Sequence, residues 1–156
     1  MATMMGDLYD QHRDAIATDI VGNIERGARL TPNEIFDAQR TKWSLHQNLC
    51  RFFESHDAMI CPAVSVEPFS IDQHYVTSID GKELQTYIDW FAITFILSMT
   101  ACPVLSLPCG LTKSGLPVGL QIVGPPRGEA QLLSMAAQLE TLFDFQFRLP
   151  VDPRPS

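Results

Sequence analysis

Residues 103–124 read PVLSLPCGLTKSGLPVGLQIVG, and their pattern predicts the β-sheet around which the chain folds. Two apolar runs, 103–108 and 118–123, are separated by a segment in which Gly115 follows Lys113 and Ser114 and can adopt a positive φ. Apolar runs bounded by Pro and Gly are typical of strands that are covered on both faces. The stretch therefore predicts two neighbouring strands that pair with each other.

Helical patterns lie on both sides of these two strands. Apolar residues recur at three- and four-residue steps over 7–26, 31–55, 86–99 and 128–143. The second of these helices starts with Thr31, Pro32 and Glu34, which can satisfy the free N–H groups of its first turn. Gly27 is suited to end the first helix in the left-handed conformation.

The remaining segments complete an α/β fold. Residues 57–61 form a short apolar run ended by Pro62, which predicts a further buried strand. Residues 63–85 predict a long surface loop with a tight turn at Asp80 and Gly81. We expect part of a mixed β-sheet flanked by helices, in a single partial domain over 1–156 whose tail, 149–156, is loose.

Composition bounds the function. The chain has 156 residues and 46% of them are hydrophobic, which is typical of one folded domain. Eleven Lys and Arg against eighteen Asp and Glu leave a net charge of -7, so a nucleic-acid partner is not expected. Residues 90–112 carry no charge, but Pro103, Pro108 and Gly110 interrupt the helical ladder, and no membrane span is expected.

The sequence contains none of the common motifs for a catalytic serine, a bound phosphate or a bound metal ion. It contains no G-x-S-x-G serine motif, no phosphate-binding glycine loop and no H-x-x-x-H metal spacing, so we predict no cofactor and no metal. The four cysteines have no C-x-x-C spacing, which favours free, reduced thiols and a cytoplasmic location. Cys109, before Gly110, is interpreted as a buried thiol rather than a nucleophile because no histidine follows it.

Several segments together resemble the C-terminal part of amidase signature enzymes. The resemblance covers about Asp19 to Arg148, and GLPVGLQIVG at 115–124 is its most specific block. The other blocks are GARLTP at 27–32, AQR at 38–40, DAMICPA at 57–63, PVLSLPCG at 103–110, and a final helix with Glu129, Leu132, Leu133, Ala136, Ala137, Leu139 and Glu140. Members of the family often carry Asn and Gly at the positions of Ser98 and Ala101.

The resemblance implies an amide-bond hydrolase whose Ser-cis-Ser-Lys centre lies N-terminal of the matched region. This chain has no Ser-Ser pair, and none of its three lysines stands in a matching context, so no catalytic residue is assigned. The matched region contributes part of the sheet and one side of the acyl pocket in that family. Trp90 and Thr94, four residues apart on one predicted helix, are the candidate substrate-binding residues.

Three alternatives for function stay open. The chain is the C-terminal portion of an amidase, a fragment of a glutamine-dependent amidotransferase subunit, or a non-catalytic interaction protein derived from an amidase. In the first two cases an amide substrate binds only together with an N-terminal catalytic segment. Because the strands of 103–123 need cover on both faces, we also expect the isolated chain to self-associate or to need an N-terminal partner piece.

Overall fold

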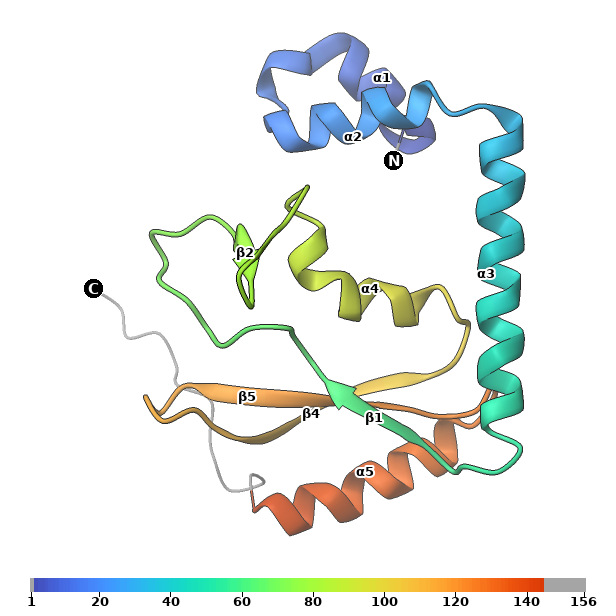
Figure 1. Ribbon diagram of the computed structural model, residues 1–156, viewed down its shortest axis with the longest axis vertical. Coiled ribbons are helices and arrows are strands. Elements are labelled where there is room, and N and C mark those ends of the chain that lie inside the picture. The colour runs from blue at the N-terminus through green and yellow to red at the C-terminus, as the bar shows by residue number, and fades with distance from the viewer. Residues whose placement is uncertain (1, 145–156) are drawn as a thin grey trace. The chain divides into compact units, whose positions relative to one another are not determined.

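The computed structural model describes residues 2–144, drawn in Figure 1, and the chain divides into two compact units, Met1–Trp43 and Ser44–Ser156. The tail predicted at 149–156 and the last residues of the predicted resemblance lie outside the described residues. The single partial domain stays a prediction. The α/β class is confirmed, since helices accompany a small sheet whose strand pairs, within 2–144, are antiparallel.

The first unit begins with a helical hairpin. It consists of α1 (Ala2–His12), the 3-10 turn η1 (Arg13–Ala15) and α2 (Thr18–Ala28). The prediction of one helix over 7–26 is therefore wrong. Ile16 and Ala17 are extended, and the returning helix lets Glu25 accept hydrogen bonds from Tyr9 at 2.8 Å and Arg13 at 2.9 Å. Gly27 lies inside α2 and is not the left-handed cap that the sequence predicts.

Helix α3 (Pro32–Phe52) confirms the capping prediction. The Thr31 hydroxyl accepts from the Glu34 N–H at 3.3 Å, while the Glu34 carboxylate accepts from the Thr31 N–H at 2.8 Å. These bonds form the reciprocal capping box, and the hydrogen bonds from Thr31 lower the pKa of Glu34.

A three-stranded antiparallel sheet forms the centre of the second unit. Its order is β1 (Met59–Pro62), β5 (Pro117–Val123) and β4 (Val104–Leu111), so the two strands of residues 103–124 pair as predicted. Gly115 in their connection has a φ of 85°, as expected. The prediction that the first strand is buried on both faces is wrong, because β1 lies at an edge and Ile60 is 56% exposed.

One face of the sheet packs against α5 (Glu129–Phe143), which confirms the last predicted helix. Directly opposite residues of antiparallel strands share a face, and Leu105 pairs with Ile122 while Leu107 pairs with Leu120. The core of this layer consists of buried Leu107, Ile122, Leu132 and Ala136. The sheet therefore presents its other face to the segment between β1 and β4 (Figure 1).

That segment holds a small hairpin and a short helix. The hairpin, β2 (Ser78–Ile79) and β3 (Lys82–Glu83), turns through Asp80 at φ 50° and Gly81 at φ 73°, which confirms the predicted tight turn. A 3-10 turn, η2 (Asp89–Phe91), leads into α4 (Ala92–Ser98), so the helix predicted over 86–99 is shorter than expected. The Asp89 carboxylate accepts from the N–H groups of Gln85 and Thr86, which fixes these two residues before the helix.

The uncharged residues 90–112 are thus divided among η2, α4, a turn and β4. Within 2–144, no helix combines the length and the hydropathy that a bilayer span requires. The turn after α4 contains Ala101 at φ 57°, in the left-handed region that glycine adopts most readily. The resemblance implies a glycine at this position. Alanine occupies it here, although residues with a Cβ ordinarily avoid a positive φ.

Candidate functional site

A row of three polar side chains crosses the sheet face that does not meet α5. Cys61 of β1 pairs with Gln121 of β5, and Gln121 pairs with Ser106 of β4, so the three lie side by side on consecutive strands. Their neighbours Leu105 and Ile122 face α5, which places this polar row on the opposite face. Ser106 is exposed, whereas Gln121 is 4% exposed.

Gln121 connects the middle strand to the edge strand. Its side-chain amide donates to the Pro62 carbonyl at 3.1 Å and lies 3.8 Å from Cys61 Sγ. Burial, the larger effect, raises the pKa of the Cys61 thiol, although the Gln121 hydrogen bond opposes it. Cys61 is therefore a neutral thiol at neutral pH, and the polar row consists of uncharged groups.

The end of β1 lies close to β5 at a glycine. A Cβ on Gly119 would be 3.3 Å from the Leu107 oxygen and 3.4 Å from the Ala63 Cβ, so a larger residue would push β1 away. The Ala63 N–H donates to the Gly119 carbonyl at 3.0 Å. Thr94 of α4 reaches the same place, since its hydroxyl donates to the Ala63 carbonyl at 3.2 Å.

Trp90, the other predicted substrate-binding residue, belongs to an aromatic cluster. Its ring meets those of Phe69 and Phe91 edge-on, with centroid distances of 5.6 and 5.5 Å. Phe91 in turn meets Phe95 at 5.9 Å. The cluster joins η2 and α4 to the loop after β1 and forms an apolar wall.

Trp90 lies in η2 and Thr94 lies in the adjoining helix α4, and their contacts are with different residues. Trp90 is half-buried and Thr94 is exposed. A cavity of about 110 Å³ beside the hairpin is lined by residues 75–77 and 84–87, and by neither Trp90 nor Thr94. Their role in substrate binding thus stays a prediction.

Within residues 2–144, no serine lies beside a histidine nitrogen that is able to take its proton. Ser55 lies 3.0 Å from His56 Nδ1, but the same nitrogen lies 3.0 Å from the Phe52 carbonyl. A carbonyl only accepts, so Nδ1 carries a proton and cannot take one from Ser55. The described residues also hold no group of three or more His, Cys, Asp or Glu side chains that could bind a metal ion.

The sequence interpretation missed one pair of reactive groups. Cys50 Sγ lies 3.5 Å from His46 Nε2, and His46 Nδ1 lies 2.7 Å from the Thr100 carbonyl. The signal was present as H-x-x-x-C on the helix predicted over 31–55, because residues four apart share a helix face. Cys109, by contrast, donates to the Val118 carbonyl at 3.7 Å and is half-buried, so the prediction that it is a buried thiol is wrong.

Comparison with known proteins identifies relatives of this chain. The amidase family model matches residues 2–133. A glutamyl-tRNA(Gln) amidotransferase subunit of Myxococcus xanthus is 34% identical over 108 residues, which cover 69% of this chain and 21% of that protein. An acylamidase of Rhodococcus erythropolis is 24% identical over 145 residues, covering 92% of this chain and 30% of that protein.

A solved structure supports the fold. The crystal structure of a bacterial aryl acylamidase of the amidase signature family matches with a TM-score of 0.79 and 22% identity, over 96% of this chain and 34% of that one. This chain therefore spans between about a fifth and a third of the length of the relatives named here.

Proposed function

The chain belongs to the amidase family, and from this premise we propose that it is the C-terminal portion of an amide-bond hydrolase and supplies one wall of the acyl site. Two features of the second unit support this role, the neutral polar row (Cys61, Gln121 and Ser106) and the aromatic cluster around Trp90. Uncharged hydrogen-bonding groups suit an amide, and an apolar wall suits an acyl group.

We propose that the nucleophile comes from residues other than these 156. An amide is attacked by a deprotonated serine, and a neutral lysine acting through a second serine can remove the proton. Neither a Ser-Ser pair nor a lysine in a matching context occurs in the chain, and Ser55 has no free base beside it. These residues therefore bind and orient the substrate.

The purified chain is expected to leave small aliphatic and aromatic amides and glutamine uncleaved, with rates equal to the buffer blank. Addition of the part of the Rhodococcus erythropolis acylamidase that precedes its matched region should produce hydrolysis, because that part would carry the reacting groups. Release of ammonia or arylamine is the measurement. Cleavage by the chain alone, with a nucleophile mapped inside it, would refute the proposal. A stable but inactive complex would instead favour a non-catalytic interaction protein.

The amidotransferase alternative rests on a separate observation, the 34% identity to the glutamyl-tRNA(Gln) amidotransferase subunit of Myxococcus xanthus. Both classes handle an amide, and they differ in the acyl group that the pocket admits. The substrate panel therefore distinguishes them. Hydrolysis restricted to glutamine favours the amidotransferase subunit, and hydrolysis of aryl or alkyl amides favours a free-standing amidase.

We propose that Trp90 and Thr94 face the acyl group. In the reconstituted enzyme, Trp90→Ala is expected to raise KM roughly tenfold with a smaller change in kcat, because an apolar wall contributes to ground-state and transition-state binding alike. Trp43→Ala, at a tryptophan that is 61% exposed in the other unit, is the matched control and should leave KM unchanged. An equal change in KM for the two variants would show that Trp90 does not contact the acyl group.

We further propose that the isolated chain self-associates through β4. This eight-residue strand lies at the edge of the sheet, contains no charged residue, and leaves Val104 37% and Leu111 43% exposed. Uncharged edge strands pair readily with other strands. The four free cysteines support the further proposal of a cytoplasmic location.

A further inference from the structure

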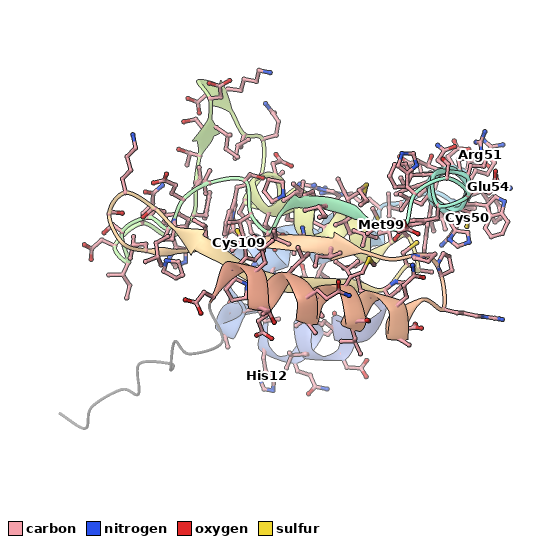
Figure 2. The ribbon with its side chains drawn as sticks, turned by 90° about the horizontal axis from the view of Figure 1, so that it is seen from below. His12, Cys50, Arg51, Glu54, Met99 and Cys109 are labelled. Atoms are coloured by element: carbon pink, nitrogen blue, oxygen red, sulfur yellow. The ribbon has the colours of Figure 1, made fainter. Side chains whose placement is uncertain are left out.

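We propose that Cys50 is a nucleophilic thiol, activated by His46, and that it is a site of oxidation by hydroperoxides. The pair lies on α3, away from the polar row and the aromatic cluster, so this reactivity is independent of the amide chemistry proposed above. Figure 2 shows Cys50 on α3, which is seen nearly end-on, with Arg51 and Glu54 on the same helix and Met99 next to it.

The hydrogen bond from His46 to Thr100 determines which imidazole nitrogen is basic. The Thr100 carbonyl can only accept, so at 2.7 Å it requires a proton on His46 Nδ1. In the neutral ring Nε2 then carries a lone pair, and Cys50 Sγ lies 3.5 Å from it. The thiol thus donates to a base that is already in the correct tautomer.

The acceptor that orients His46 is held rigidly. Thr100 is fully buried, and its hydroxyl donates to the Leu97 carbonyl at 2.7 Å while accepting from the Cys102 N–H at 3.3 Å. Its carbonyl therefore stays in place when the imidazole becomes charged and can stabilise the resulting imidazolium through the Nδ1 proton. This is the same division of roles as in other thiol–imidazole pairs with an orienting third group.

The other three cysteines have no such partner within residues 2–144. Cys61 accepts from Gln121, and Cys109 donates to a backbone carbonyl. Burial raises the pKa of the Cys102 thiol and the pKa of the Cys61 thiol, which keeps both protonated. Cys50 is half-buried and therefore partly reachable by a small reagent. Cys102 interacts electrostatically with Cys50, and Arg51 and Glu54 lie on the same helix as the pair.

The oxidation step balances with a hydroperoxide as the sole co-reactant. The Cys50 proton passes to His46 Nε2, and the sulfur electron pair attacks the nearer peroxide oxygen. The O–O bond breaks, and the departing oxygen takes the proton from the imidazolium and leaves as water or an alcohol. The sulfur is oxidised to a sulfenic acid while the peroxide is reduced.

The test uses hydrogen peroxide with dimedone, and mass spectrometry of the four cysteine peptides of the native chain. Cys50 is expected to gain the sulfenic-acid adduct roughly tenfold faster than the other three cysteines, because His46 Nε2 lies 3.5 Å from its sulfur and can take the thiol proton as the sulfur attacks. His46→Gln, which keeps a donor for Thr100 and removes the base, should lower the Cys50 rate to that of Cys109. His56→Gln is the matched control, since His56 contacts the Phe52 carbonyl and no thiol, and should change nothing.

Two outcomes would overturn the assignment. One is equal labelling of Cys50 and Cys109 in the native chain, and the other is a Cys50 rate that does not respond to His46→Gln in a folded variant. If that variant does not fold, the relative labelling rates of the four cysteines in the native chain decide. Cys50 should still be labelled faster than Cys61, Cys102 and Cys109, and a Cys50 rate no higher than theirs would refute the activation.

Discussion

Ile122→Ala is expected to lower the free energy of unfolding by about 2–5 kcal/mol, the range for truncating a buried isoleucine in a well-packed core. Ile122 lies on the middle strand, is 1% exposed, and packs with Leu107, Leu132 and Ala136 between the sheet and α5. Its removal leaves a cavity that neither the paired strands nor the helix can close without losing their register. Urea unfolding followed by circular dichroism measures the loss.

Ile71→Ala is the matched control for this substitution. Ile71 loses the same atoms but is 99% exposed in the loop after β1, so its truncation should change the free energy of unfolding by less than about 0.5 kcal/mol. A similar loss in both variants would show that the layer between the sheet and α5 is not the stabilising core. An unchanged m-value in both would confirm that the comparison concerns the same cooperative transition.

The predictable parts of the fold are those that short stretches of chain determine. The strands on either side of Gly115, the capping box at Thr31 and the turn at Asp80 each depend on residues within a few positions of one another. The sequence therefore predicts them correctly. The α1–α2 hairpin was missed because its cause is a contact between Tyr9 and Glu25, sixteen residues apart.

The site was less predictable for the same reason. The polar row exists because register aligns Cys61, Gln121 and Ser106, which come from three segments of the chain. The Cys50–His46 pair is visible in the sequence as a four-residue spacing, but the Thr100 carbonyl that selects the tautomer lies 54 residues from His46. Resemblance to a family conveys the fold that creates such contacts, whereas periodicity alone does not.

Gly128→Ala is expected to destabilise the protein by about 3 kcal/mol, at the upper end of the usual effect of overpacking. Gly128 precedes α5, and a Cβ there would be 2.8 Å from both the Pro125 Cγ and the Pro125 carbonyl oxygen. That carbonyl also accepts from the Gly128 N–H at 2.9 Å, so the turn cannot open without losing this bond. Because α5 covers the sheet, a displaced turn would shift Leu132 out of the core.

Gly22→Ala is the matched control and is expected to change the free energy of unfolding in the opposite direction. Gly22 lies inside α2, and a Cβ added there would have nothing within 4 Å, so alanine should stabilise that helix by about 0.5–1 kcal/mol. Unfolding curves of the two variants therefore should move in opposite directions from the parent. An unchanged unfolding midpoint for Gly128→Ala would contradict this prediction. It would mean that residues 125–128 can adopt a second conformation that still holds α5 on the sheet. The close approach to Pro125 would then not determine where the helix starts.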